Sequence, residues 1–150
     1  MVQFKSGFHI GTFNADESND SIFNIRYVRV QNCGQNNVMG RYCFHFHLKK
    51  KCTSCTLVGN AVVNSVQGAI VVHGTHQSEV KKNILWDSVS VGLYTEDGNE
   101  MNNTFSENVM ICSGKRSKLT PNPPKSLPSR EFKISTNVNG QATNGKENLV

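Results

Sequence analysis

Three segments of the chain repeat one pattern, in which an Asn is followed by three apolar residues, a polar or small residue and a Ser. The three Asn residues stand at positions 60, 83 and 108, which are 23 and 25 residues apart. Self-similarity at a period of 20–50 residues is the signature of a repeat architecture. The repeated segments are too short for helices and rich in β-branched residues, so they indicate short strands. The pattern therefore predicts a solenoid of stacked coils rather than a self-contained globular enzyme.

A second ladder is interleaved with the first and consists of residues 44–47, 70–73 and 94–97. Its last members, His47, His73 and Asp97, are 26 and 24 residues apart. Two ladders of short strands predict an all-β fold, a right-handed parallel β-helix of about four coils, with a rise of about 4.8 Å between coils. An Asn amide at a corner can bond to the Asn of the next coil, so we predict that Asn60, Asn83 and Asn108 align at one corner as structural residues.

The repeat ends near residue 113, and the chain changes character after it. All four prolines lie between residues 121 and 128, and residues 137–145 are polar. Such a composition lacks the apolar surface needed for packed coils. We therefore predict two parts: a parallel β-helix fragment over residues 1–113, and an irregular Pro/Asn-rich tail over residues 114–150 that is a loop or disordered.

The formal net charge of +5 favours an anionic partner. Basic residues cluster at 49–51, 81–82 and 115–116, although loop lysines are often only a solvated surface. No apolar run approaches the length of about 18 residues that a membrane span needs, so we expect no transmembrane segment in this chain. The first residues lack the apolar core of a signal peptide, which leaves the localisation of the fragment open.

Alternate residues of a strand share a face, so His45 and His47 should point away from Phe44 and Phe46. Stacking of the coils would then bring His47, His73 and Asp97 into one column. A carboxylate beside an imidazole fixes its tautomer, and two close imidazoles disfavour double protonation, which keeps one of them neutral as a base. We therefore predict a catalytic group on this face; it consists of His47, His73, Asp97 and Glu96.

The same face carries groups that suit a sugar polymer. Arg41 can hold a sugar carboxylate through two parallel hydrogen bonds, although it can equally form a structural salt bridge. A group of imidazoles and carboxylates suits polysaccharide cleavage, either with two carboxylates or by β-elimination. The alternative is a hydrogen-bonded structural ladder without catalysis. The predicted substrate contacts are Arg41, His45, His76 and Glu100.

The chain has five cysteines, and the odd number argues against a closed disulfide framework. The Cys52-x-x-Cys55 pair follows His45-x-His47, and these residue types suit tetrahedral zinc. Free thiols or a local disulfide are the competing interpretations. We expect no bound metal, with His45, His47, Cys52 and Cys55 as the set that would hold one.

Three motifs resemble the β-helix region that the cell-surface hyaluronidases, the cell-migration-inducing hyaluronidase and the fibrocystins share. They are Gly40-Arg41-Tyr42-Cys43-Phe44-His45-Phe46-His47, Val72-His73-Gly74-Thr75-His76 and Thr95-Glu96-Asp97-Gly98-Asn99-Glu100. They occur in the family's order, and the resemblance covers about residues 8–113. Two departures are Cys43, where the family has Pro, and the segment 49–55, where we expect a Gly/Asp turn.

The resemblance implies an extracellular or cell-surface protein in which this fragment is flanked by further β-helix coils. It implies a module that binds, and in one branch cleaves, an anionic polysaccharide such as hyaluronan, and no nucleic acid. It establishes no cofactor but allows Ca²⁺. Whether the module is an enzyme stays open, because a fibrocystin-like receptor or scaffold without chemistry is the alternative. A pectin-type lyase or hydrolase is a further alternative, since such β-helices share the coil ladder without the three motifs.

Overall fold

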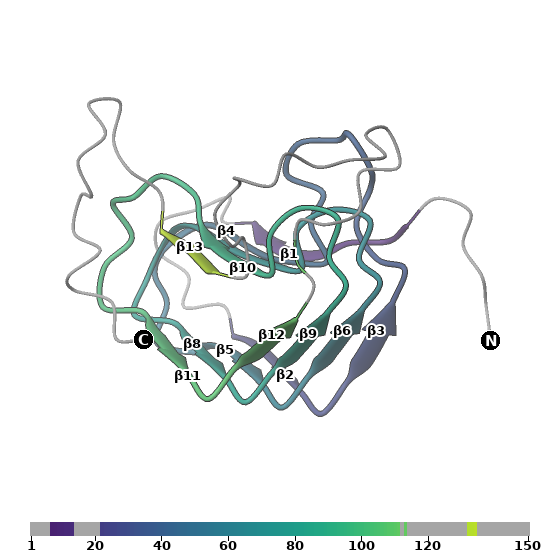
Figure 1. Ribbon diagram of the computed structural model, residues 1–150. Helices are drawn as coiled ribbons and strands as arrows, with labels where there is room; N and C mark the ends of the chain where they lie inside the picture. Colours follow the sequence, from purple (N-terminus) through teal and green to yellow (C-terminus); the bar gives the residue numbers. More distant parts are fainter. Residues whose placement is uncertain (1–6, 14–21, 112, 114–131, 135–150) are drawn as a thin grey trace.

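The computed structural model describes residues 7–13, 22–111, 113 and 132–134, and the strands in these ranges form three parallel sheets (Figure 1). Sheet A consists of β1 (Ile10–Phe13), β4 (Phe44–Lys51), β7 (Ile70–His76), β10 (Leu93–Thr95) and β13 (Phe132–Ile134). Sheet B consists of β2 (Phe23–Arg26), β5 (Cys55–Val58), β8 (Glu79–Lys81) and β11 (Thr104–Ser106). Sheet C consists of β3 (Arg29–Gln31), β6 (Ala61–Val63), β9 (Ile84–Trp86) and β12 (Val109–Ile111).

The chain passes through sheets A, B and C in turn and then returns to sheet A one step further along the stack. Each strand therefore pairs with its counterpart in the preceding and following coils, as in the order β3-β6-β9-β12. Figure 1 shows sheets B and C meeting at the lower corner, with sheet A above them. The fold is the predicted right-handed parallel β-helix, and the described residues supply four strands each to sheets B and C and five to sheet A. In the described residues, no helix has the length and apolar character needed to cross a bilayer.

The core lies between the three sheets, because every second residue of each strand points inward. In sheet A, Phe44 of β4 pairs with Ile70 of β7, which pairs with Leu93 of β10, and all three are fully buried. Phe46 and Val72 form a second fully buried row beside them. Burying such a side chain contributes about 1.5–3 kcal/mol. The inward rows thus fix the register that places the outward residues of sheet A.

Each coil turns from sheet B to sheet C through one residue with a positive φ angle. These residues are Tyr27, Gly59, Lys82 and Glu107, with φ between 56° and 69°. At Gly59 the close approach also excludes a side chain, since a Cβ there would lie 2.7 Å from the Tyr27 ring. The left-handed residue thus precedes the repeated Asn, rather than being that Asn.

The repeated Asn residues form the predicted ladder at this corner. The Asn83 Oδ1 accepts hydrogen bonds from the Asn60 backbone N–H at 2.9 Å and side-chain amide at 3.1 Å. The Asn108 Oδ1 accepts the equivalent bonds from Asn83, both at 3.0 Å. Each side-chain amide also donates to a backbone carbonyl of the preceding coil. The prediction that the three Asn residues align as structural groups is confirmed.

Two disulfides close local loops at the ends of strands, and they correct the prediction drawn from the odd cysteine count. Cys33 pairs with Cys43, and Cys52 pairs with Cys55. All four are buried in the core. The odd number of cysteines misled because it excludes only complete pairing and leaves any four of the five free to pair. Cys112 lies outside the described residues.

The predicted boundary at residue 113 is only partly described. Within the segment for which we predicted a loop, β13 pairs parallel with β10 and extends sheet A by one strand. The prolines and the segment 137–145 lie outside the described residues, so the prediction of an irregular tail stays a prediction.

Candidate functional site

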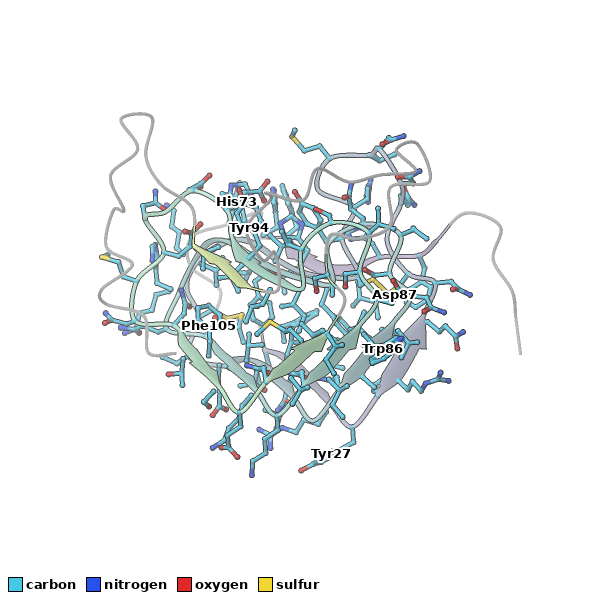
Figure 2. The ribbon with its side chains drawn as sticks, in the orientation of Figure 1. Tyr27, His73, Trp86, Asp87, Tyr94 and Phe105 are labelled. Carbon is cyan, nitrogen blue, oxygen red and sulfur yellow. A yellow bond between two sulfur atoms is a disulfide. The ribbon has the colours of Figure 1, made fainter. Side chains whose placement is uncertain are left out.

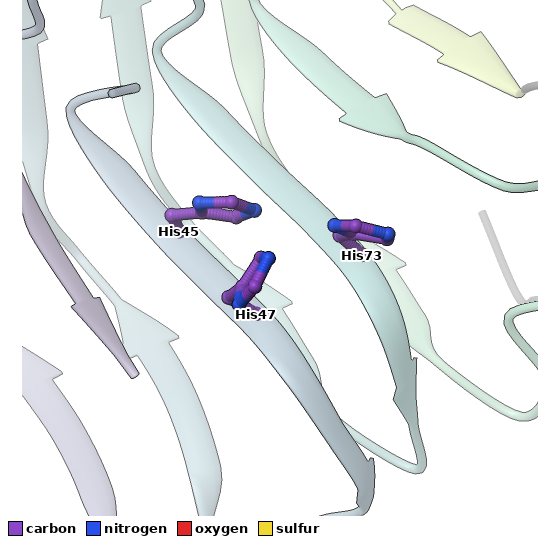
Figure 3. Close-up of side chains that lie close together, drawn as sticks. All are labelled: His45, His47 and His73. Carbon is purple, nitrogen blue, oxygen red and sulfur yellow. The ribbon is translucent and has the colours of Figure 1, made fainter. Parts of the chain in front are cut away.

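Three histidines cluster on the outer side of sheet A, opposite the core. His45 and His47 are two positions apart on β4 and therefore share a face of the sheet, and His73 of β7 pairs with His47. The ring centroids lie 4.8 Å apart for His45 and His47, 4.9 Å for His47 and His73, and 5.9 Å for His45 and His73. Figure 2 shows His73 and Tyr94 on this side of the sheet, and Figure 3 shows one nitrogen of each ring turned toward a common space. The predicted stacking of His47 on His73 is confirmed.

His45 is almost completely buried, with 3% of its surface exposed. Its Nδ1–H donates to the Gly40 carbonyl at 2.9 Å, because a carbonyl can only accept. Burial lowers the pKa of His45 to about 3, so the ring is neutral near pH 7 and its Nε2 carries a lone pair. That Nε2 is buried without a hydrogen-bond partner.

His47 is half-buried beside the other two rings. Its pKa is lowered, first by burial and then by the neighbouring His73. The exposed ring of Phe13 stacks on it with a centroid distance of 5.7 Å and an interplanar angle of 14°. His47 is therefore a neutral imidazole that is reached from the open side of the sheet.

His73 lies between two carboxylates. Its Nε2 is 3.0 Å from the Asp97 Oδ2, and its Nδ1 is 3.4 Å from the Glu96 Oε2. The Glu96 Oε1 accepts a hydrogen bond from the Tyr42 hydroxyl at 2.9 Å, and its Oε2 lies 3.8 Å from the His45 Nε2. Burial and the adjacent Glu96 raise the pKa of Tyr42, which keeps it a hydroxyl donor. The structure thus brings together all four predicted catalytic residues.

The predicted register of the third coil was wrong by one residue. Thr95 of β10 pairs with Val72, and the Glu96 N–H donates to the Val72 carbonyl, so Glu96 rather than Asp97 follows His73 in the ladder. Thr95 is fully buried and points inward. The spacing misled because Asp97 begins a turn and reaches His73 from beyond the end of the strand.

Glu100, a predicted substrate contact, is bonded to the backbone of a turn. Only 1% of its surface is exposed, and its carboxylate accepts hydrogen bonds from the backbone N–H groups of Gly74, Asp97 and Gly98. These bonds hold the turn that carries Asp97. The carboxylate thus has a structural role, and its role as a substrate contact stays a prediction.

His76, the other predicted contact on β7, lies beyond a register shift between β4 and β7. Its Nδ1 accepts a hydrogen bond from the Met101 N–H at 3.0 Å. Gly74 has φ of 51°, and a Cβ there would meet Leu48 at 2.7 Å, so the strand bends between His73 and His76. No described contact joins His76 to the three-histidine cluster, and its role as a substrate contact stays a prediction.

Arg41 is exposed at the edge of a groove of about 400 Å³ that also includes His45, His47 and Phe13. Its Nη1 donates to the Nε2 of His9 at 2.7 Å. Burial and the adjacent guanidinium lower the pKa of His9, so this imidazole accepts as a neutral base. His9 and Phe13 were not predicted from the sequence as members of this face, although residues 8–13 alternate much as residues 44–47 do. That alternation was the signal that could have placed them on this face.

The zinc set suggested by the sequence is excluded by the disulfide. Cys52 and Cys55 are joined to each other, so neither offers a thiolate. In the basic cluster 49–51, Lys49 is buried whereas Lys50 and Lys51 are exposed, and in the cluster 81–82 both lysines pair with Glu107, at 3.2 and 3.6 Å. Residues 115–116 lie outside the described residues. Of the described residues that line the groove, Arg41 is the one Lys or Arg.

The fold and the cluster define a parallel β-helix module that carries a histidine–carboxylate site on one sheet. The chain belongs to the CEMIP β-helix family, whose model matches residues 7–149. The match extends beyond the three motifs and includes most of the segment predicted as a tail.

Three relatives illustrate the range of the family. Human cell surface hyaluronidase CEMIP2 is 34% identical over 96 residues, which are 59% of this chain and 7% of that protein. Mouse fibrocystin-L is 35% identical over 88 residues, 58% of this chain and 2% of that protein. A G8 domain-containing protein of Dictyostelium discoideum is 34% identical over 84 residues, 56% of this chain and 7% of that protein. The chain thus spans a small part of these relatives. No solved structure matches it significantly.

Proposed function

We propose that this module binds an anionic polysaccharide of the hyaluronan type in the groove on the outer side of sheet A. The observation that carries the proposal is the groove itself, in which the Arg41 guanidinium and the His45 and His47 rings border one open space. Its volume of about 400 Å³ lies within the range of 300–1,000 Å³ usual for ligand sites. A groove on an open sheet accepts a polymer that extends beyond it.

The chemistry of the groove suits an acidic sugar. Arg41 donates one N–H to His9, and the other N–H donors of its planar guanidinium can bind a carboxylate. The Phe13 ring is 72% exposed and offers an apolar surface to the face of a sugar ring. The module also belongs at the cell surface or outside the cell, since two disulfides persist in oxidising compartments. The name of the human relative supports the same polymer and place.

The test is calorimetric titration of the full chain with hyaluronan oligosaccharides of defined length. Arg41→Gln should weaken binding about tenfold or more, because a charge-assisted hydrogen bond contributes about 1.5–3 kcal/mol. Arg29→Gln is the matched control, since Arg29 is also exposed but lies on sheet C. Binding should weaken as salt rises, and a neutral glucan should not compete.

Equal losses in Arg41→Gln and Arg29→Gln would show that only net charge matters and that the groove is not the site. No binding by the folded wild-type chain would favour the fibrocystin-like scaffold, which needs no polysaccharide.

A second candidate function is cleavage of the same polymer. The observation that favours it is the position of His73 between the carboxylates of Glu96 and Asp97. Gel filtration of long hyaluronan after incubation with the chain tests it. His73→Ala should abolish any loss of polymer length, and Asp97→Asn should reduce it while preserving shape. If polymer length falls equally with both variants, the cleaving group is elsewhere.

A further inference from the structure

The space between the three histidines is bordered by electron-pair donors. His45 turns a lone pair into it, because its Nδ1–H is fixed on the Gly40 carbonyl and its Nε2 has no hydrogen-bond partner. The Glu96 Oε2 lies 3.8 Å from that nitrogen. A nearly buried nitrogen without a partner is rare in a folded protein, since leaving it unpaired costs about 1–3 kcal/mol.

His73 offers a second ring nitrogen to the same space. Its Nε2 lies 3.0 Å from the Asp97 carboxylate, so this nitrogen carries the donating hydrogen. The other ring nitrogen, Nδ1, faces the Glu96 Oε2 at 3.4 Å. A carboxylate this close to a ring nitrogen is balanced either by a proton on that nitrogen or by a cation that both groups bind.

We propose that His45, His47 and His73 bind one divalent transition-metal ion of the zinc class. One ring nitrogen from each histidine lies within 4.8 Å of the other two (Figure 3). Tetrahedral zinc with bonds of about 2.0–2.1 Å holds its ligands about 3.4 Å apart, so the widest separation of 4.8 Å must close by about 1.4 Å to complete the set. The proposal goes beyond polysaccharide binding and does not depend on it.

The groups around the histidines are those that usually support a metal. A ligating imidazole commonly donates its other N–H to a carbonyl or a carboxylate. His45 donates to the Gly40 carbonyl, and His73 lies against Asp97. The Tyr42 hydroxyl fixes Glu96, whose other oxygen borders the space. Each partner comes from a loop beside the strands rather than from the strand that carries its histidine.

The donor set selects the type of metal. Three imidazoles suit Zn²⁺, Cu²⁺, Ni²⁺ or Fe²⁺, whereas Ca²⁺ takes six to eight oxygen ligands. The histidines therefore do not fit the Ca²⁺ that the resemblance allowed. Three protein ligands also leave the fourth position open, as in catalytic zinc sites. That position faces the groove, since His45 and His47 both border it.

The test is titration of the full chain with Zn²⁺ by calorimetry, and with Co²⁺, whose visible absorption reports tetrahedral nitrogen coordination. Wild-type protein should bind about one ion per chain. His47→Gln and His73→Gln should each lower the affinity at least about 100-fold, and Asp97→Asn about 10-fold or more. His76→Gln is the matched control, because His76 lies on the same strand as His73 but outside the cluster, and it should bind normally.

His45→Phe guards against a folding artefact, since it removes a ligand and keeps a buried ring. It should lose metal binding while retaining the thermal transition of the wild type without metal. No uptake of Zn²⁺ or Co²⁺ by the folded wild-type chain would overturn the proposal and mean that a proton on His73 Nδ1 balances Glu96. Equal loss of metal in His76→Gln would also overturn it, by moving the ion elsewhere.

Metal and polysaccharide binding are separated by measuring each without the other. The metal titration contains no sugar, and the hyaluronan titration is repeated with a chelator. Metal uptake without hyaluronan binding would leave the metal site standing and remove the proposed function. Hyaluronan binding without metal uptake would do the reverse.

Discussion

Two regions of this molecule stack polar side chains from coil to coil, and the regions differ in how completely these side chains are hydrogen-bonded. At the corner between sheets B and C, Asn60 and Asn83 are 1% and 0% exposed, and their amides bond to the next Asn and to the backbone. On the outer side of sheet A, His45 is 3% exposed and keeps an unpartnered nitrogen. Burial is nearly equal, and only the satisfaction of the polar groups differs.

The difference separates a structural ladder from a candidate site. The Asn ladder uses one residue type in three successive coils, because every coil presents the same unpaired backbone groups at that corner. On sheet A the outward positions read His47, His73 and Glu96, and no residue type is kept. The stack of coils needs the Asn ladder to fold, whereas folding does not require the histidines and the glutamate on sheet A.

The largest expected effect is therefore on the Asn ladder. Asn83→Ala removes the acceptor of two hydrogen bonds from Asn60 and the donor to the Leu57 carbonyl. The Asn60 N–H and the Leu57 carbonyl lose these partners, so at about 1–3 kcal/mol for each group the free energy of unfolding should fall by about 2–6 kcal/mol. Urea denaturation measures it.

The matched control is Asn36→Ala, because Asn36 is exposed in a turn. It should change the free energy of unfolding by no more than about 0.5 kcal/mol. If the two variants unfold alike, the Asn ladder is not what holds the corner together, and the comparison between the regions fails.

A smaller effect is expected from the Cys33–Cys43 disulfide, which closes the loop that carries Gly40, Arg41 and Tyr42. Replacing both cysteines by Ala should cost about 2–3 kcal/mol, as expected for a loop of this length. It should also weaken Zn²⁺ binding, because the loop fixes His45 and Glu96 through Gly40 and Tyr42.

The Cys52–Cys55 pair serves as the control for this loop, because it spans only three residues and lies away from the groove. Its removal should cost about 1 kcal/mol less and leave metal binding intact. Equal loss of metal in both double variants would mean that general loosening, rather than the loop, controls the site.

The sequence predicted those parts of the fold that repeat. The Asn spacings identified the corner, and the 26-residue spacing paired His47 with His73, since one hydrogen-bonded register governs every residue of a strand. It failed by one residue at Asp97, where the strand has ended and a turn sets the position. Periodicity carries no information beyond the last paired residue.

The site was predictable only in its residue types. The sequence identified His45, His73 and Glu96, but not which of their atoms would face one another. Glu100 was predicted as a substrate contact because the sequence pattern does not reveal the turn at Gly98, whose N–H binds the Glu100 carboxylate. Cys52 and Cys55 looked like metal ligands because the same spacing serves a disulfide and a zinc site equally well.

The smallest expected change in stability at neutral pH belongs to His45→Phe. The substitution loses the hydrogen bond to Gly40 but also removes the unpartnered Nε2, so the free energy of unfolding without metal should change by about 1 kcal/mol or less.

At lower pH the stabilities of the wild type and His45→Phe should differ. The pKa of His45 is lowered from 6.5 to about 3 in the folded chain, so below pH 6.5 the unfolded chain binds a proton that the folded chain refuses. The stability that His45 contributes is complete above pH 6.5 and falls as the pH drops toward 3. Between pH 7.5 and 5 the wild type should lose roughly 2 kcal/mol more than His45→Phe, measured by urea denaturation with a chelator present. His9 and His47 also have lowered pKa values, but they are present in both proteins and so cancel in the difference. Parallel losses in the two proteins would mean that His45 is protonated in the folded chain, and its nitrogen would then be a donor rather than the open electron pair that distinguishes this cluster from the Asn ladder.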